Sequence, residues 1–275
     1  MVKPQLTIQL SDAQRIPQIG LGVWQASDED ARAAVRVALE EGYRHVDTAS
    51  IYGNEKGVGE GLRDAGIPRE QVFLTTKIWN DAHGFEPATA ALDASLERLN
   101  VDYVDLLLIH WPVPGQDNYV DTWRALINAQ RNGKARSIGV SNFNPDHLQK
   151  LMDETGVAPV LNQIELHPFM QQEALRSAHE SMGIATQSWS PLGQGSALND
   201  PVVLDIARKH GRTAAQVIIR WHIELGLIAI PKSITPSRIR ENFNVFDFSL
   251  ETSDLAAIVA LDYGKRLGPD PSIFA

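Results

Sequence analysis

The sequence of 275 residues predicts a (β/α)8 barrel, and three observations support this fold. Short apolar runs, typical of strands covered on both faces, alternate along the chain with segments of helical periodicity. Eight such units fit in roughly 250 residues, which is the usual length of this barrel. A doubly wound open sheet is the alternative, but its GxGxxG turn is missing, since GVGEGL has Leu62 in place of the third glycine. No linker rich in Pro, Gly or Ser interrupts the chain, so we expect a single domain over residues 1–275.

Two short alternating segments, residues 6–10 and 16–20, flank the polar SDAQR and predict a small hairpin. The eight barrel strands are then expected at residues 20–24, 45–49, 72–78, 104–110, 136–141, 160–166, 185–190 and 227–232. Helices are expected between them, as in residues 28–42, where apolar residues repeat every four positions and Gly42 closes the turn. An extra helix is expected at residues 251–261, and the tail from residue 265 is too rich in Pro and Gly for regular structure.

Composition excludes several classes of function. The net charge is −9, and no basic stripe with interleaved aromatic residues occurs, so nucleic acid and anionic membranes are not expected as partners. The absence of cysteine excludes disulfides, thiolate nucleophiles and cysteine-based metal sites. The eight histidines show no HExxH arrangement, so no catalytic metal is expected. No apolar segment has the length of a signal peptide core or a membrane span, which predicts a soluble cytoplasmic protein.

Four polar side chains stand at the carboxyl ends of neighbouring predicted strands. The segment GYRHVDTASIYGNEKGVG, residues 42–59, places Asp47 at the end of the second strand and Tyr52 in the loop that follows. Lys77 ends the third strand and His110 ends the fourth. Ordinary alternatives exist: Asp47 as a turn former, Lys77 as a surface lysine, His110 as a core histidine, and the pair of Asp47 and Tyr52 as a common surface pairing. Because the carboxyl ends of barrel strands converge on one mouth, the four together indicate an active site.

This set of side chains suits the protonation of a carbonyl oxygen. A free tyrosine has a pKa of about 10 and is a weak acid at neutral pH. Lys77 beside Tyr52 is expected to lower the pKa of the phenol, Asp47 to hold Lys77 charged, and a neutral His110 to orient the substrate oxygen. With neither metal nor thiol, a hydride would have to come from a bound nicotinamide.

Three long motifs resemble the aldo-keto reductase family, and the likeness covers almost the whole chain. They are residues 42–59, LERLNVDYVDLLLIHWPV at 96–113, and IPKSITPSRIRENFNVF at 230–246. The resemblance implies that Asp47, Tyr52, Lys77 and His110 are the catalytic tetrad, with Tyr52 as the general acid. It further implies that NADPH supplies the hydride and that the protein is a monomer.

Cofactor contacts are also implied by the resemblance. Ser141, Asn142 and Gln163 would bind the nicotinamide carboxamide, and Trp189 would stack on the ring unless it only lines the barrel. The loop beside the pyrophosphate would contain Ser190, Leu192, Gly193 and Gln194.

The segment PKSITPSRIREN predicts the choice between the two nicotinamide cofactors. Lys232, Ser233 and Arg238 would bind a 2′-phosphate, which favours NADPH over NADH unless this segment is merely a solvated basic turn. Glu241 and Asn242 match family positions at the adenine end.

The substrate is expected to be a small carbonyl compound. Trp24, Trp79 and Trp111 follow the first, third and fourth strands and, with His110, would wall a largely apolar pocket. The segments LGLGVWQAS, TTKIWNDAH, IHWPVPGQDNY, NQIELHPFMQQ and GKRLGPDP resemble bacterial 2,5-diketo-D-gluconate reductases. This likeness implies reduction of 2,5-diketo-D-gluconate and of small dicarbonyls such as methylglyoxal. A broad-spectrum aldehyde reductase and an NADPH-binding regulatory protein remain as alternatives.

Overall fold

The computed structural model describes residues 5–274 and contains a closed barrel of parallel strands. Each strand pairs with its neighbours in chain order, and bridges from Ile19 to Ala229 and from Gly22 to Lys232 join the first strand to the last. This closure confirms the predicted (β/α)8 barrel and excludes the open sheet. The eight strands are β3 (Leu21–Gly22), β4 (His45–Asp47), β5 (Phe73–Ile78), β6 (Val104–Ile109), β7 (Ala135–Ser141), β8 (Leu161–Glu165), β9 (Ala185–Trp189) and β10 (Ile228–Ala229).

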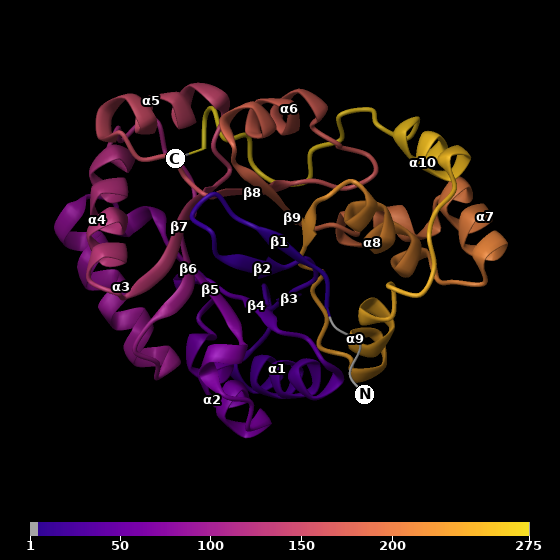
Figure 1. Ribbon diagram of the computed structural model, residues 1–275, viewed down its shortest axis with the longest axis horizontal. Coiled ribbons are helices and arrows are strands. Elements are labelled where there is room, and N and C mark those ends of the chain that lie inside the picture. The colour runs from indigo at the N-terminus through magenta and orange to yellow at the C-terminus, as the bar shows by residue number, and fades with distance from the viewer. Residues whose placement is uncertain (1–4, 275) are drawn as a thin grey trace.

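Helices form a ring around the strands (Figure 1). They are α1 (Asp28–Glu41), α2 (Glu55–Ala65), α3 (Phe85–Leu99), α4 (Tyr119–Arg131), α5 (Pro145–Thr155), α6 (Glu173–Met182), α7 (Pro201–His210), α8 (Ala214–Glu224), α9 (Pro236–Phe243) and α10 (Thr252–Val259). The predicted extra helix is α10. The segment between β9 and β10 holds both α7 and α8, one helix more than the repeating unit requires.

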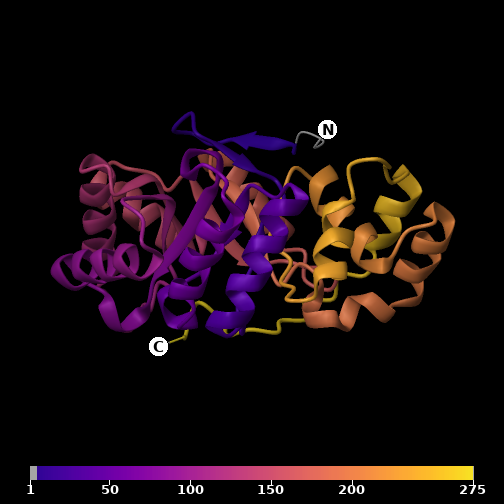
Figure 2. The same ribbon diagram turned by 90° about the horizontal axis from the view of Figure 1, so that it is seen from below.

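The predicted hairpin consists of β1 (Thr7–Gln9) and β2 (Arg15–Pro17), which pair antiparallel. Ile16 of this hairpin packs with Phe73, Leu106 and Ile228, so the hairpin closes the amino-terminal end of the barrel. Figure 2 shows the hairpin at one end of the molecule and the C-terminal tail along the opposite end. The carboxyl ends of the strands therefore face the tail.

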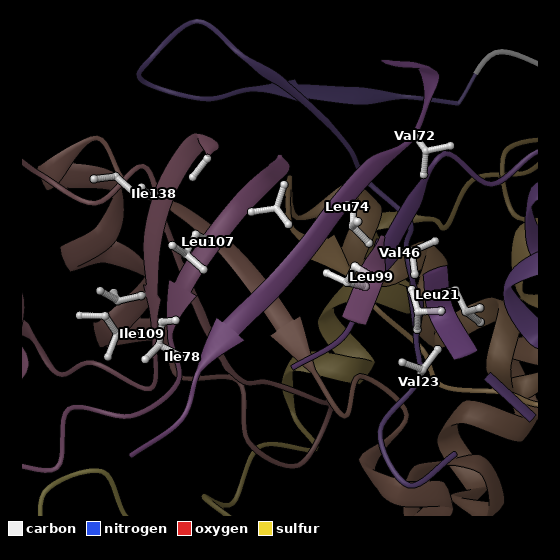
Figure 3. Packing of buried hydrophobic residues seen from close by; sticks show 14 of the residues in the cluster. Leu21, Val23, Val46, Val72, Leu74, Ile78, Leu99, Leu107, Ile109 and Ile138 are labelled. Atoms are coloured by element: carbon white, nitrogen blue, oxygen red, sulfur yellow. The ribbon is translucent and has the colours of Figure 1, made fainter. Parts of the chain in front are cut away.

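Alternation along each strand decides which residues reach the barrel interior. Val46 of β4 packs toward the helices, in the apolar layer shown in Figure 3, whereas His45 and Asp47 point inward. Burying such an aliphatic side chain stabilises the fold by about 1.5–3 kcal/mol. The same alternation in β5 sends Leu74 outward and Lys77 inward. The apolar layer thus fixes the register that delivers polar side chains to the mouth.

The glycines of residues 57–61 serve packing between helices. A Cβ on Gly57 would lie 2.0 Å from the Asp28 carbonyl oxygen, and one on Gly59 would lie 2.1 Å from that of Leu99. Neither position tolerates a side chain because the clash in each case is with backbone. The two glycines allow α2 to lie directly against the start of α1 and the end of α3, and so hold the loop that carries Tyr52.

Candidate active site

A cavity of about 540 Å³ opens at the carboxyl ends of the strands. Its lining includes twelve residues that the sequence predicts: Trp24, Asp47, Tyr52, Trp79, His110, Trp111, Asn142, Gln163, Trp189, Ser190, Gln194 and Lys232. Volume and composition suit a small organic ligand, because most of the lining is aromatic or apolar and only a few polar groups converge on it.

Lys77 lies directly beneath this cavity and is completely buried. Its Nζ donates hydrogen bonds to Asp47 Oδ1 at 2.5 Å and to the Thr48 carbonyl oxygen at 2.9 Å. Burial lowers the pKa of Lys77, but Asp47 and Tyr52 raise it by more, so the net shift is upward. Lys77 therefore remains an ammonium ion, and the same Nζ lies 5.1 Å from the centre of the Tyr52 ring.

Tyr52 ends a short 3-10 turn, η1 (Ser50–Tyr52), that follows β4. Ser50 Oγ donates to the Lys77 carbonyl oxygen at 3.0 Å, which fastens this turn to β5. Burial raises the pKa of Tyr52, Lys77 lowers it and Asp47 raises it, with a net upward shift. The predicted fall in this pKa is thus wrong, because desolvation of the phenolate outweighs the attraction of the ammonium group. Tyr52 is a neutral phenol at physiological pH and holds the proton it would donate.

His110 stands beside Tyr52 on the wall of the cavity. Its ring centre lies 5.8 Å from that of Tyr52 and 5.0 Å from that of Trp79, in edge-on contacts. Burial and, to a smaller extent, Lys77 hold the pKa of His110 well below its ordinary value. Nδ1 is buried and has no hydrogen-bond partner among residues 5–274. A neutral imidazole at this position can orient a ligand oxygen without competing for its proton.

The three residues that the sequence predicts to bind the carboxamide form hydrogen bonds to one another, to His110 and to Asp47. Asn142 Nδ2 donates to Ser141 Oγ and to the His110 carbonyl oxygen, both at 3.0 Å, and Ser141 Oγ donates to the Gln163 carbonyl oxygen at 2.8 Å. Gln163 Nε2 donates to Asp47 Oδ2 at 2.7 Å. The side chains of Asn142 and Gln163 still line the cavity, where their oxygens can accept hydrogen bonds. A ligand that carries an amide NH2 group therefore fits this wall.

Trp189 is fixed at the end of β9 in a manner that suits ring stacking. Its Nε1 donates to Asn142 Oδ1 at 2.7 Å, so the indole is held in one orientation at the cavity. An aromatic face held in this way provides a surface for a planar ring. The Trp189 face and the side-chain oxygens of Asn142 and Gln163 would suit the planar, amide-bearing ring that the sequence predicts.

Further predicted cofactor residues lie after β9 and β10. Lys232 borders the cavity, and Ser233 Oγ accepts a hydrogen bond from the Thr235 amide at 3.2 Å just before α9. Arg238 stands in the first turn of α9 and is exposed, and within residues 5–274 it forms no ion pair. Near the end of α9, Asn242 is buried and Glu241 accepts from Thr213 Oγ1 at 2.8 Å. Leu192 and Gly193 lie in the tight turn after β9.

The contribution of the C-terminal tail to the cavity was not predicted from the sequence. Leu267, Gly268, Pro269 and Phe274 all contribute to the lining, as does Ile51. The Phe274 ring lies 4.6 Å from Trp111 and 6.5 Å from Trp79, measured between ring centres. The tail has no regular secondary structure, as predicted, but it forms one wall of the site.

Buried Glu165 holds this tail in place. Its carboxylate accepts hydrogen bonds from the amides of Leu267 at 2.6 Å and Gly268 at 3.0 Å, and lies 3.0 Å from His167 Nε2. Gly268 is required by close approach, because a Cβ there would lie 2.5 Å from the Trp189 ring. The single acidic residue in NQIELHPF, Glu165 within the strand predicted at residues 160–166, was the one sequence signal that could have indicated a buried anchor at the end of β8.

Residues 5–274 contain neither a metal-binding cluster nor a membrane-spanning helix. No group of three or more His, Cys, Asp or Glu side chains is arranged to hold a metal ion. No helix in this range is both long and apolar enough to cross a membrane.

Comparison with known proteins points in one direction. The model of the Aldo/keto reductase family matches residues 18–263. An aldo-keto reductase of Mycolicibacterium smegmatis is 55% identical over 273 residues, which cover 99% of this chain and 98% of that protein. Methylglyoxal reductase DkgA of Escherichia coli K12 is 54% identical over 269 residues, 97% of each chain. The crystal structure of a Gox0644 mutant in complex with NADPH superposes with a TM-score of 0.95 at 48% identity, covering 99% of this chain and 100% of that one.

Proposed function

The chain belongs to the aldo/keto reductase family of oxidoreductases, and from this premise we propose that it reduces small dicarbonyl compounds to hydroxycarbonyl compounds with NADPH. The observation that carries the proposal is the position of Lys77, a buried ammonium held by Asp47 beneath the Tyr52 phenol at the floor of an apolar cavity. In this arrangement the Tyr52 hydroxyl can donate its proton to a substrate carbonyl oxygen that enters the cavity.

Bound NADPH supplies a hydride to the carbonyl carbon. The fit of Trp189, Asn142 and Gln163 to a planar amide-bearing ring supports binding of the nicotinamide there. Lys232 and Arg238 support binding of the 2′-phosphate near α9, since both are cationic and the amino terminus of a helix favours an anion. The complex of the Gox0644 mutant with NADPH agrees with this choice of cofactor.

Tyr52 gives its proton to the substrate oxygen as negative charge develops there. The charged Lys77 stabilises the resulting phenolate, and Asp47 keeps Lys77 charged and in place. A neutral His110 directs the substrate oxygen toward the Tyr52 hydroxyl. General acid catalysis of this kind contributes typically about 10²–10⁴ in rate.

The cavity and the relatives support the proposed substrate class. Trp24, Trp79, Trp111 and Phe274 make the entrance apolar, while His110 and Tyr52 offer two polar contacts at its floor. Methylglyoxal, with two adjacent carbonyl groups, fits these contacts, and a relative at 54% identity is named a methylglyoxal reductase. The resemblance to diketogluconate reductases makes 2,5-diketo-D-gluconate the second candidate.

A panel assay tests the proposal. NADPH oxidation at 340 nm is followed with methylglyoxal, 2,5-diketo-D-gluconate, simple aldehydes and aldoses, for the wild type and for Tyr52→Phe. We expect the highest kcat/KM on the two dicarbonyls, and a loss of at least about a hundredfold in Tyr52→Phe with unchanged NADPH affinity. Equal efficiency across the aldehydes would instead indicate a broad-spectrum reductase. NADPH binding without turnover of any carbonyl would indicate a regulatory protein.

A further inference from the structure

A chain of hydrogen bonds runs through the barrel interior from its closed end to the active site. Starting at the hairpin, the Pro17 carbonyl oxygen lies 3.2 Å from His45 Nδ1, and His45 Nε2 lies 3.4 Å from Gln187 Nε2. Gln187 Oε1 then accepts from Gln163 Nε2 at 2.9 Å, and the same Nε2 donates to Asp47 Oδ2 at 2.7 Å. His45, Gln187, Gln163 and Asp47 are each buried, with at most 1% of their surface exposed.

The Pro17 carbonyl fixes the direction of this chain. A carbonyl oxygen can only accept, so His45 Nδ1 must carry the proton. A neutral His45 then has an unprotonated Nε2, which must accept a hydrogen bond, and the Gln187 amide group is positioned to donate it. Burial supports the neutral form, because it lowers the pKa of His45 to about 4. Thr75 Oγ1, 3.5 Å from the same nitrogen, is a second and longer donor.

Gln187 and the Asp47 carboxylate together set the orientation of the Gln163 amide. The NH2 group of Gln187 faces His45, so its oxygen faces Gln163. Gln163 donates one N–H to this oxygen and its second N–H to Asp47. Both amide hydrogens of Gln163 are thereby used inside the barrel. Its oxygen is left for the cavity, which Gln163 lines. If the Gln163 amide were reversed, its oxygen would meet the Asp47 carboxylate and the Gln187 oxygen, and all three atoms are acceptors.

We propose that His45 and Gln187 are positioning residues that set the amide orientation of Gln163 and, through it, the placement of Asp47. This inference rests on the proposed function, since the Gln163 oxygen is the group that would receive the carboxamide NH2 of the cofactor. Neither residue touches the cavity. Close packing preserves the chain, because a Cβ on Gly20 would lie 2.6 Å from His45 Nδ1, so only glycine leaves room for the ring.

The barrel offers a matched control for a purely structural role. Gln18 is also buried, and its Nε2 donates to the Ile223 and Leu227 carbonyl oxygens, both at 3.2 Å. It therefore satisfies buried backbone groups as Gln187 satisfies buried side chains, but within residues 5–274 it forms no hydrogen bond with Gln163. Gln18→Met should destabilise the protein without altering the active site.

The test compares Gln187→Met with Gln18→Met by NADPH titration, monitored through tryptophan fluorescence, and by thermal unfolding. We expect both variants to lower Tm, but only Gln187→Met to raise the Kd for NADPH, by about fivefold to tenfold, as the loss of one oriented hydrogen bond implies. An NADPH Kd in Gln187→Met equal to that of the wild type would overturn the inference. A wild type that binds no NADPH would instead refute the proposed function.

Variants of His45 and the tautomer itself give independent evidence. His45→Leu should weaken NADPH binding, and His45→Gln, whose amide can donate to Pro17 and accept from Gln187, should restore it to within about twofold of the wild type. Equal weakening by both variants would contradict a directional role. In 15N-labelled wild-type protein, NMR should show His45 protonated on Nδ1 alone, and protonation on Nε2 would overturn the inference whether or not NADPH binds.

Discussion

Lys77 Nζ lies 2.5 Å from Asp47 Oδ1, and neither side chain has appreciable contact with solvent. A buried ion pair of this kind contributes little net stability, but removal of one partner leaves an uncompensated charge and costs about 3–5 kcal/mol. The main effect of the pair is therefore to keep the Lys77 ammonium group beneath Tyr52, and its net contribution to stability is small.

The first prediction concerns this pair. Asp47→Asn should lower the free energy of unfolding by about 3 kcal/mol, because Lys77 stays buried without its counter-ion. It should also lower kcat by at least about tenfold, since the Tyr52 phenolate would lose an oriented ammonium partner. Urea unfolding and steady-state kinetics measure the two effects. Arg124→Met is the control, as it removes only exposed ion pairs, with Asp121 and Glu154, and should change stability by less than about 1 kcal/mol. Equal losses of stability in the two variants would contradict the interpretation that Lys77 and Asp47 form a buried ion pair in solution.

The second prediction follows from the raised pKa of Tyr52. Tyr52 is active as the protonated phenol, so kcat/KM for reduction should be constant through neutral pH and fall as the pH rises through the pKa of the phenol. Lys77 lowers that pKa, so in Lys77→Met the residual activity should fall at a higher pH than in the wild type. A pH profile of kcat/KM in stable buffers distinguishes these cases. A fall in the wild type that is already complete below pH 8 would contradict the upward shift.

The third prediction concerns cofactor choice. Arg238→Ala should raise the Kd for NADPH about tenfold and leave that for NADH unchanged, because one charge-assisted contact to the 2′-phosphate would be lost. Arg240 lies on the same helix but pairs with Glu41 at 2.5 Å, so Arg240→Ala is a matched control that should change neither Kd. An unaltered ratio of the two affinities in Arg238→Ala would show that the 2′-phosphate does not bind at this turn.

The strands and the floor of the site could be predicted from the sequence for a simple physical reason. A period of two places Asp47 and Lys77 on the inner face of adjacent strands, and their ends must then meet at the mouth. The direction of the Tyr52 pKa could not be obtained in this way. It depends on how deeply the phenol is buried, which no spacing along the chain reveals.

Contacts between segments that are distant in the chain could not be predicted from the sequence either. The hydrogen bond from the Leu267 amide to Glu165 joins residues 102 positions apart in the chain. The hydrogen bond from Gln163 to Asp47 joins residues 116 positions apart. Gly268 and Pro269 indicated an irregular tail, but irregular backbone has no periodicity that would show what it covers. Only the fold places that tail on Trp189.

The fourth prediction tests the contact between the tail and Trp189. In Gly268→Ala, the new methyl group would meet the indole at 2.5 Å, so either the tail or Trp189 must move. Because the tail forms one wall of the cavity and Trp189 another, we expect KM for carbonyl substrates to rise by about threefold or more, with a shift in tryptophan fluorescence and little change in Tm. Gly115→Ala is the control, since a Cβ at Gly115 would meet no atom within 4 Å. If Gly268→Ala matched this control in both KM and fluorescence, the tail could not be held against the indole in solution, and Glu165 would be an anchor without effect on the active site.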